Sequence, residues 1–315
     1  MTFASRSARV PGLTLALAFA RALALIAGGG LLALAAPEAH ASRWGKDYLP
    51  NSPVISQDGQ TFRFYDNLIK DKIFVISFLF TSCRDVCPLA AARLSLLQEK
   101  LGDRVGRDIF LYSISIDPEN DTPDKLKEYA KAFGAGPGWL FLTGLPEDIK
   151  EIRYKLGERS RYLGEHRNEV MLGNGATGEW QRDSALGDLD RLVMAIQGMN
   201  PAWPTDAGNT VRTSPDLQAY AINGPAGETL FLKACAGCHT VGKGDRVGPD
   251  LEGVVERRKR DWLTSFIANP AKMRAGKDPI ALALMAKYPA VRMPAIGVSE
   301  SEAADLIAYI EASGK

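Results

Sequence analysis

The sequence predicts two domains of different class, an α/β domain followed by an all-α domain. Three observations support this prediction. Apolar strand-like runs alternate with amphipathic helical segments over residues 48–200. Helical segments without strand-like runs occupy residues 218–315. Residues 201–217 lie between them, are punctuated by Pro and Gly, show no periodicity and are typical of a linker.

The first domain begins with two buried strands and the helix between them. Residues 72–80 and 108–117 are apolar runs rich in Ile, Val and Phe, which predicts strands. Residues 88–101 predict a helix with Pro88 in its first turn, where the missing N–H of proline costs nothing. The later predicted elements are helices over 123–133, 146–156 and 186–199, a strand over 139–142, and a hairpin of strands 169–173 and 179–182. This order indicates a thioredoxin-like α/β fold.

The second domain predicts helices only. Residues 225–233 lead into a cysteine motif, and residues 260–268 form an amphipathic segment that ends before a proline. Residues 299–312 predict the last helix, because Ser299 and Glu302 have the spacing of a capping box.

Residues 1–41 predict a signal peptide. The segment has a basic start, an apolar stretch over 22–36 and an Ala-His-Ala cleavage pattern at 39–41. An arginine and three consecutive glycines make it a poor spanning helix, which needs roughly 20 apolar residues. A membrane-anchored form is the alternative. We therefore expect a periplasmic or otherwise extracytoplasmic protein.

The charge balance predicts no nucleic-acid partner. The formal charge is +1, and removal of a leader with three arginines and one glutamate would bring it to −1. A nearly neutral chain has no large electrostatic attraction for nucleic acid.

The soft metal ligands occur in two groups. The four cysteines form two close pairs, one in each predicted domain, and one histidine accompanies each pair. The third histidine lies in the predicted leader. This distribution indicates a protein with two redox centres.

The second pair lies in Cys235-Ala-Gly-Cys238-His239, the attachment motif for c-type haem. Both cysteines can bond one haem, and the adjacent histidine can bind its iron. A thioredoxin-type pair or half of a zinc site is the alternative, disfavoured because His239 follows directly and no other cysteine remains. We expect Met293 as the sixth ligand, a thioether that raises the haem potential. Met273 competes for this role, and Met285 is expected in the core.

This region resembles class I cytochrome c over residues 218–315. The resemblance rests on the haem motif, on Gly248-Pro249-Asp250-Leu251, on Met293-Pro294 and on a last helix that contains Tyr309. It implies one covalently bound haem c that transfers single electrons to a redox partner. It also implies that the Pro249 carbonyl accepts a hydrogen bond from the His239 ring.

The first pair, Cys83 and Cys87, spans the predicted turn from strand to helix. A helix start favours thiolates by lowering the thiol pKa. Two thiolates suit Cu(I), and one added imidazole also suits Cu(II). A redox-active or purely structural disulfide is the alternative. His166 precedes a predicted strand and is the candidate third ligand, although a lone histidine is more often a satisfied polar residue.

This domain resembles the Sco/SenC family of thioredoxin-like proteins. The matching segments are residues 78–88, which contain both cysteines, residues 113–123, and His166 ahead of the hairpin. Glu165 stands where the family usually has Asp. The resemblance implies one copper ion bound by Cys83, Cys87 and His166, and delivery of copper to the copper-bearing subunit of cytochrome oxidase. Asp117 could orient the site or only cap its turn.

Three functions remain open from the sequence. The first is a copper-binding maturation factor whose haem exchanges one electron with the copper. The second is a thiol–disulfide oxidoreductase coupled to the haem, which needs two electrons per turnover. The third is a redox or copper sensor.

Overall fold

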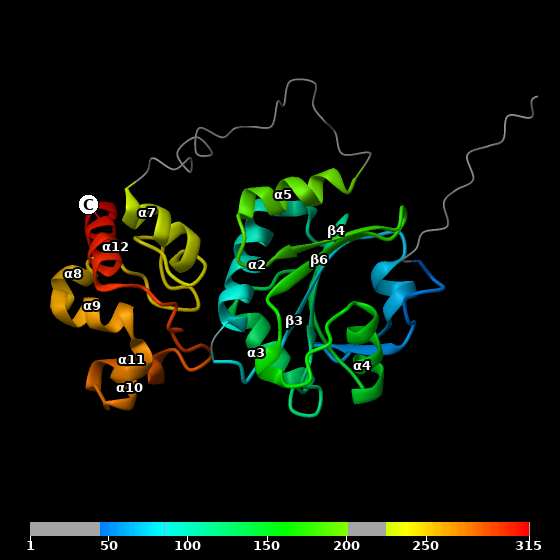
Figure 1. Cartoon of the computed structure of the whole chain (residues 1–315), viewed down its shortest axis with the longest axis horizontal. Coiled ribbons are helices and arrows are strands. Elements are labelled where there is room, and N and C mark those ends of the chain that lie inside the picture. Colours follow the sequence, from blue (N-terminus) through cyan, green and yellow to red (C-terminus); the bar gives the residue numbers. More distant parts are fainter. Residues whose placement is uncertain (1–44, 85, 201–224, 315) are drawn as a thin grey trace, which may run out of the picture. The chain divides into compact units, whose positions relative to one another are not determined.

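The computed structural model describes residues 45–84, 86–200 and 225–314 (Figure 1). The predicted leader and linker lie outside these residues. Among the helices of the described ranges, none is both long and apolar enough to span a membrane.

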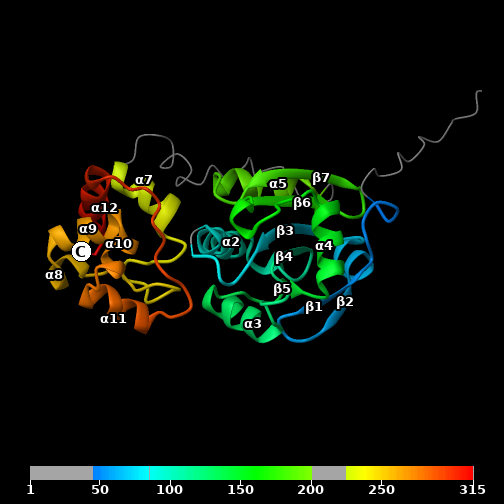
Figure 2. The ribbon, with the colours of Figure 1, turned by 60° about the horizontal axis from the view of Figure 1, so that its bottom comes forward.

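Residues 45–200 contain a mixed sheet with helices on both faces (Figures 1 and 2). Its described strands follow the order β2-β1-β5-β4-β3-β6-β7. The central strands β5, β4 and β3 are parallel, whereas β6 and β7 extend the sheet antiparallel from β3. The strands are β1 (Pro53–Ser56), β2 (Thr61–Arg63), β3 (Ile73–Leu79), β4 (Ile109–Ser115), β5 (Trp139–Thr143), β6 (Glu169–Asn174) and β7 (Glu179–Ser184).

The helices divide between the two faces of this sheet. Helices α2, α3 and α5 cover one face, and α4 with η1 covers the other (Figure 2). Side chains alternate along β3, so Val75 enters the core beneath α2 while Phe74 and Ile76 enter the core beneath α4. The helices are η1 (Phe64–Ile69), α2 (Cys87–Leu101), η2 (Gly102–Arg104), α3 (Pro123–Ala132), α4 (Pro146–Lys155), η3 (Leu163–Glu165) and α5 (Leu189–Gly198).

The predicted α/β class and its main elements are confirmed. Strand β3 is buried along its whole length, as an apolar run on a two-sided sheet requires. Helix α2 begins at Cys87, one residue before the predicted start. Strands β1 and β2 were not predicted; they form a short edge hairpin whose turn contains Gly59 with a φ of +77°.

Residues 225–314 are helical, as predicted (Figure 1). Helix α7 crosses the last helix, α12, and Gly227 makes this close approach possible. A Cβ atom at Gly227 would lie 2.0 Å from the Asp305 carbonyl oxygen. The helices are α7 (Ala226–Leu230), η4 (Phe231–Cys235), α8 (Val254–Arg257), α9 (Arg260–Ala268), α10 (Pro270–Ala275), α11 (Pro279–Lys287) and α12 (Glu300–Ser313).

Two details of this region differ from the sequence expectation. The predicted helix over 225–233 is a short α-helix that continues as a π-helical turn, and α8, α10 and α11 were not predicted. The capping box at Ser299 and Glu302 is confirmed, because each residue's side chain meets the other's backbone N–H.

Candidate metal centres

Cys83 and Cys87 lie on either side of the turn from β3 into α2. Cys87 is the first residue of α2, and its backbone N–H donates to the Cys83 Sγ at 3.4 Å. The Cys87 side chain is buried, the Cys83 side chain is partly exposed, and no disulfide joins these two described residues. The turn therefore holds two thiols side by side at one end of the sheet.

The helix start does not lower the pKa of the Cys87 thiol, contrary to our expectation. The hydrogen bond with Cys83 raises this pKa, and burial and the neighbouring Cys83 charge raise it further. Backbone N–H donors act in the opposite direction but are weaker. The physical reason is that two adjacent sulfurs in a buried turn cannot both carry charge unless a cation joins them.

Asp121 anchors the segment that carries Cys83. Its carboxylate is 1% exposed and accepts hydrogen bonds from the Thr81 backbone N–H at 3.1 Å and from the Ser115 hydroxyl at 2.6 Å. Asp117, which we considered as an orienting residue, accepts instead from the Asn120 side chain at 2.9 Å and caps its own turn. The sequence analysis missed Asp121, although it lies within the 113–123 segment that carries the resemblance.

The sheet register brings His166 to the same sheet edge as the cysteines. Ser77 of β3 lies opposite Val170 of β6 in an antiparallel pair, so the start of β6 lies beside the end of β3. His166 precedes β6 and Cys83 follows β3.

The His166 ring is held by one nitrogen. Its Nδ1 lies 3.0 Å from the Glu158 carboxylate, and the His166 and Glu158 side chains are 4% and 5% exposed. Its Nε2 is buried and has no hydrogen-bond partner among the described residues. A buried polar atom without a partner is costly, and a metal ion at Nε2 would satisfy it.

Glu158 is a second residue that the sequence analysis missed. Burial alone would raise the pKa of its carboxyl, but hydrogen bonds from His166 and Ser160 outweigh burial and lower the pKa to about 2. Arg153 lies 3.8 Å away and adds positive charge. Glu158 is therefore ionised at neutral pH and can fix the His166 ring with Nδ1–H as donor.

The three predicted copper ligands are not assembled into a closed site. Within the described ranges, no three His, Cys, Asp or Glu side chains lie together closely enough to hold a metal ion. The two thiols and the buried, unpartnered Nε2 of His166 are nevertheless donors that suit copper. The ligand set of Cys83, Cys87 and His166 therefore stays a prediction.

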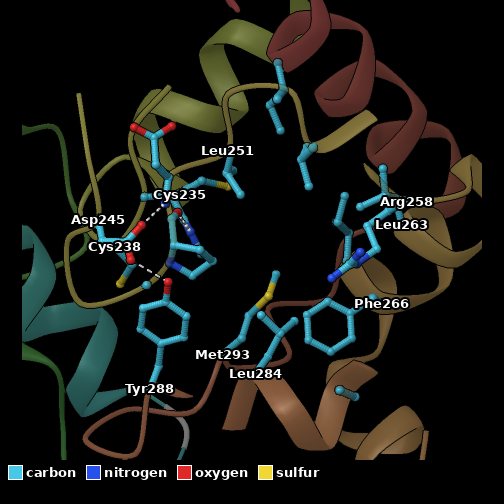
Figure 3. Close-up of a pocket in the computed structure, with 18 of the residues that line it drawn as sticks. Cys235, Cys238, Asp245, Leu251, Arg258, Leu263, Phe266, Leu284, Tyr288 and Met293 are labelled. Atoms are coloured by element: carbon cyan, nitrogen blue, oxygen red, sulfur yellow. Dashed lines mark hydrogen bonds between the residues drawn. The ribbon is translucent and has the colours of Figure 1, made fainter. Parts of the chain in front are cut away.

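The helical region encloses a cavity of about 980 Å³ around the haem motif (Figure 3). This volume lies within the range of cofactor sites. Cys235 and Cys238 line one side, and Met293 extends into the cavity (Figure 3). His239 is also among the lining residues. Much of the remaining wall is apolar and includes Leu251, Leu263, Phe266, Leu284 and Ile307. The residues present therefore fit a haem.

The His239 ring has the orientation that iron binding needs. Its Nδ1 lies 2.9 Å from the Pro249 carbonyl oxygen, which confirms the predicted contact. Since a carbonyl can only accept, Nδ1 carries the proton and Nε2 is left as the ligand atom. Burial lowers the pKa of His239 and favours this neutral form. Gly248 makes room for the ring, because a Cβ atom there would lie 2.6 Å from the His239 Cε1.

Asp250 orders the loop that follows His239. Its carboxylate accepts hydrogen bonds from the Thr240 hydroxyl at 2.9 Å and from the backbone N–H groups of Gly242 and Glu252 at 2.9 and 2.8 Å. Burial raises the pKa of Asp250, but these donors outweigh it and lower the pKa below its usual range.

Burial alone raises the pKa of the Cys235 thiol to about 12.

The structure separates the three candidate sixth ligands. Met293 and Met285 line the cavity, whereas Met273 is not among its lining residues. Met285 is therefore a wall residue, and our expectation that it belongs to the core is wrong. It sits on α11, several of whose side chains line the cavity. Met293 as the iron ligand stays a prediction.

Two family models match the chain. Residues 46–173 match SCO1/SenC, and residues 225–313 match cytochrome c. The chain carries a Sco domain fused to a cytochrome c domain. The predicted fold classes of both parts agree with these matches.

Known relatives match the Sco domain. An SCO1 protein homolog of Bacillus subtilis is 34% identical over 102 residues, which is 32% of this chain and 51% of the relative. An SCO2-like protein of Rickettsia conorii is 37% identical over 102 residues, or 32% of this chain and 47% of the relative. The chain thus spans about half the length of these curated relatives. The crystal structure of Arabidopsis thaliana ScoI with copper bound is similar at 25% identity and a TM-score of 0.38, over 46% of this chain and 94% of that one.

Proposed function

We propose that this protein handles copper outside the cytoplasm during assembly of the copper centre of cytochrome oxidase, and that its haem domain exchanges one electron with that copper. The observation that carries the proposal is the fusion of a Sco domain to a cytochrome c domain in one chain. Copper is the cargo, and the copper-bearing subunit of the oxidase is the receiving partner.

The Sco domain would hold the cargo with soft ligands. Cys83 and Cys87 supply two sulfurs at the start of α2, and a bound copper ion would offset the repulsion from Cys83 that raises the pKa of the Cys87 thiol. His166 would add its unpartnered Nε2 from the neighbouring strand. Two thiolates suffice for Cu(I), whereas the imidazole is needed for the harder Cu(II).

The cytochrome domain would hold one haem. Cys235 and Cys238 would carry the covalent bonds, and His239 would bind from one side with its ring fixed by Pro249. Met293 would bind from the other side, and the apolar wall excludes water. A haem held in this way supplies a one-electron iron couple, which matches the one-electron difference between Cu(II) and Cu(I).

The experiment that tests this proposal is a copper titration of the haem-loaded protein with reduced thiols. We expect one tightly held copper per haem in the wild type, and loss of this copper in the Cys83→Ser/Cys87→Ser variant. Ser82→Ala is the matched control, because Ser82 is exposed in the same turn and offers no sulfur. Absence of retained copper in the wild type would contradict the proposal.

The second candidate is an extracytoplasmic thiol–disulfide oxidoreductase. The close contact between the Cys87 N–H and the Cys83 sulfur favours it, because the pair is near enough in sequence and space to cycle. A wild-type protein that retains no copper but cycles a Cys83–Cys87 disulfide would favour this function. It would leave the buried His166 Nε2 without a role. For the third candidate, a sensor, the described residues identify no signalling partner.

A further inference from the structure

Met293 lies on a segment between two helices that is neither helix nor strand. Residues 289–298 connect α11 to α12, and beyond a turn at 289–290 this described segment contains no helix or strand. A segment of this kind has many accessible conformations, and keeping one of them costs conformational entropy. Side-chain contacts must therefore decide how firmly Met293 stays over the cavity.

The first such contact is at the start of the segment. The Tyr288 hydroxyl donates to the Asp245 Oδ2 at 2.6 Å, as the dashed line in Figure 3 shows. The other oxygen of Asp245 accepts from the Asp250 backbone N–H at 2.8 Å. Asp245 thus joins the loop that follows His239 to the segment that carries Met293.

Two further contacts hold the segment at its middle and end. The Arg274 guanidinium donates to the Met293 carbonyl at 3.2 Å, and the capping box at Ser299 fixes the entry into α12. Met293 therefore lies between an anchor at Tyr288 and one at Ser299. Tyr288 is the anchor that ties it, through Asp245, to the loop that follows His239.

We propose that the Tyr288–Asp245 hydrogen bond positions Met293 as the sixth haem ligand and thereby keeps the haem potential high. Tyr288 and Asp245 are positioning residues: they touch neither sulfur nor iron but restrict the segment to conformations in which the Met293 sulfur faces the cavity. The inference rests on the haem site of the proposed function. It does not depend on copper.

Competition by imidazole measures this effect directly. Imidazole displaces a methionine from ferric haem more readily when the methionine segment is loosely held, so its apparent affinity reports the strength of Met293 ligation. In the haem-loaded Tyr288→Phe variant we expect the apparent imidazole affinity to rise roughly three- to tenfold, the range for loss of one hydrogen bond. The reduction potential should fall as well, because thioether ligation raises it.

Two variants serve as controls. Tyr309→Phe makes the same chemical change in the same domain, where the ring packs on Phe231, and should leave imidazole affinity and potential unchanged. Asp245→Asn keeps one oxygen to accept from either Tyr288 or the Asp250 N–H and should lie between the wild type and Asp245→Ala. The ring contact of Lys287 with Tyr288 survives in the phenylalanine variant, so only the hydroxyl is tested.

Wild-type imidazole affinity and potential in Tyr288→Phe would overturn the inference. So would equal changes in Tyr288→Phe and Tyr309→Phe. If Tyr288→Phe fails to retain haem, Asp245→Ala against Asp245→Asn gives the same comparison, with a larger imidazole affinity expected for the alanine variant. Both readouts come from the haem, so a wild-type protein that binds no copper would contradict the copper proposal and leave this test intact.

Discussion

His166 has one nitrogen engaged and one nitrogen available. The Glu158 carboxylate accepts from Nδ1–H, so the lone pair is on Nε2, which is buried without a partner in the described chain. A carboxylate behind a histidine fixes the ring and makes it a stronger ligand. The contact between Glu158 and His166 therefore favours binding of a metal ion by the His166 Nε2 at this sheet edge.

At the scale of single residues, the first prediction concerns which oxidation state of copper needs His166 as a ligand. His166→Ala should weaken Cu(II) binding far more than Cu(I) binding, because two thiolates alone still suit Cu(I). Affinities measured by chelator competition in each oxidation state test this. Arg167→Ala, an exposed neighbour, is the control. Equal and negligible losses in both states would rule out His166 as a ligand.

The second prediction concerns the acid sensitivity of copper-free protein. The Glu158 pKa falls from its usual 4.5 to about 2 on folding. A depressed carboxyl pKa stabilises the fold above about pH 4.5, and this contribution is lost as pH falls from 4.5 to 2. Glu158→Gln should therefore cost up to about 3 kcal/mol of unfolding free energy at pH 7 and much less near pH 2. Urea unfolding at both pH values tests this. A difference in unfolding free energy between the wild type and Glu158→Gln that does not change with pH would contradict it.

Sequence reasoning located the ligand candidates but not the residues that hold them. The cysteine motifs and His239 follow from local spacing, and the Pro249 contact was implied by the resemblance to class I cytochrome c, so they could be predicted. Glu158 and Asp121 act on residues that the fold brings near them, and no short pattern marks such contacts. The Cys87 pKa was mispredicted because the helix start was weighed without the adjacent sulfur and burial.

At the scale of elements, hydrophobic periodicity predicted the long, buried strands and helices. Strand β3 and helix α2 carry clear patterns, and the β6–β7 hairpin has its glycine at the turn, where Gly178 has a φ of +70°. The short strands β1 and β2 carry too few residues for a period to show. Residues of the small helix α11 line the cavity, so the apolar run that contains Met285 was wrongly interpreted as protein core.

The third prediction tests the crossing of α7 and α12. A Cβ atom at Gly227 would meet the Asp305 carbonyl oxygen at 2.0 Å, and backbone atoms cannot move aside without separating the helices. Gly227→Ala should cost about 1–3 kcal/mol, seen as a lower Tm when thermal unfolding is followed by haem absorbance. Gly276→Ala is the matched control, because its nearest contact would be an ordinary 3.4 Å. A Tm equal to that of the control would show that the crossing tolerates the methyl group.

At the scale of the whole molecule, the sequence indicated two domains with one redox centre each. Both domain classes are confirmed, because strand–helix alternation and purely helical periodicity are properties of long segments. The domain boundaries, the leader and the linker stay predictions. The haem cavity could not be foreseen beyond its motif, since its walls come from α9, α11 and α12.

The fourth prediction concerns electron exchange between the two centres. If the centres exchange electrons within one molecule, the rate of haem oxidation after Cu(II) loading should not depend on protein concentration. Stopped-flow measurement over a tenfold range of concentration tests this with the full chain. A rate that rises in proportion to concentration would show that the exchange occurs between molecules and that the fusion does not serve direct transfer within one chain.

The walls of the haem cavity also bear on how the protein is made. Cys235 and Cys238 precede α9, α11, Met293 and α12 along the chain, so they leave the ribosome before most of the pocket exists. The region that will enclose the haem can close only after its last helix has arrived. Haem attached before that helix has packed would bond thiols that line the finished cavity, and it would be in place while the C-terminal half of this domain folds around it.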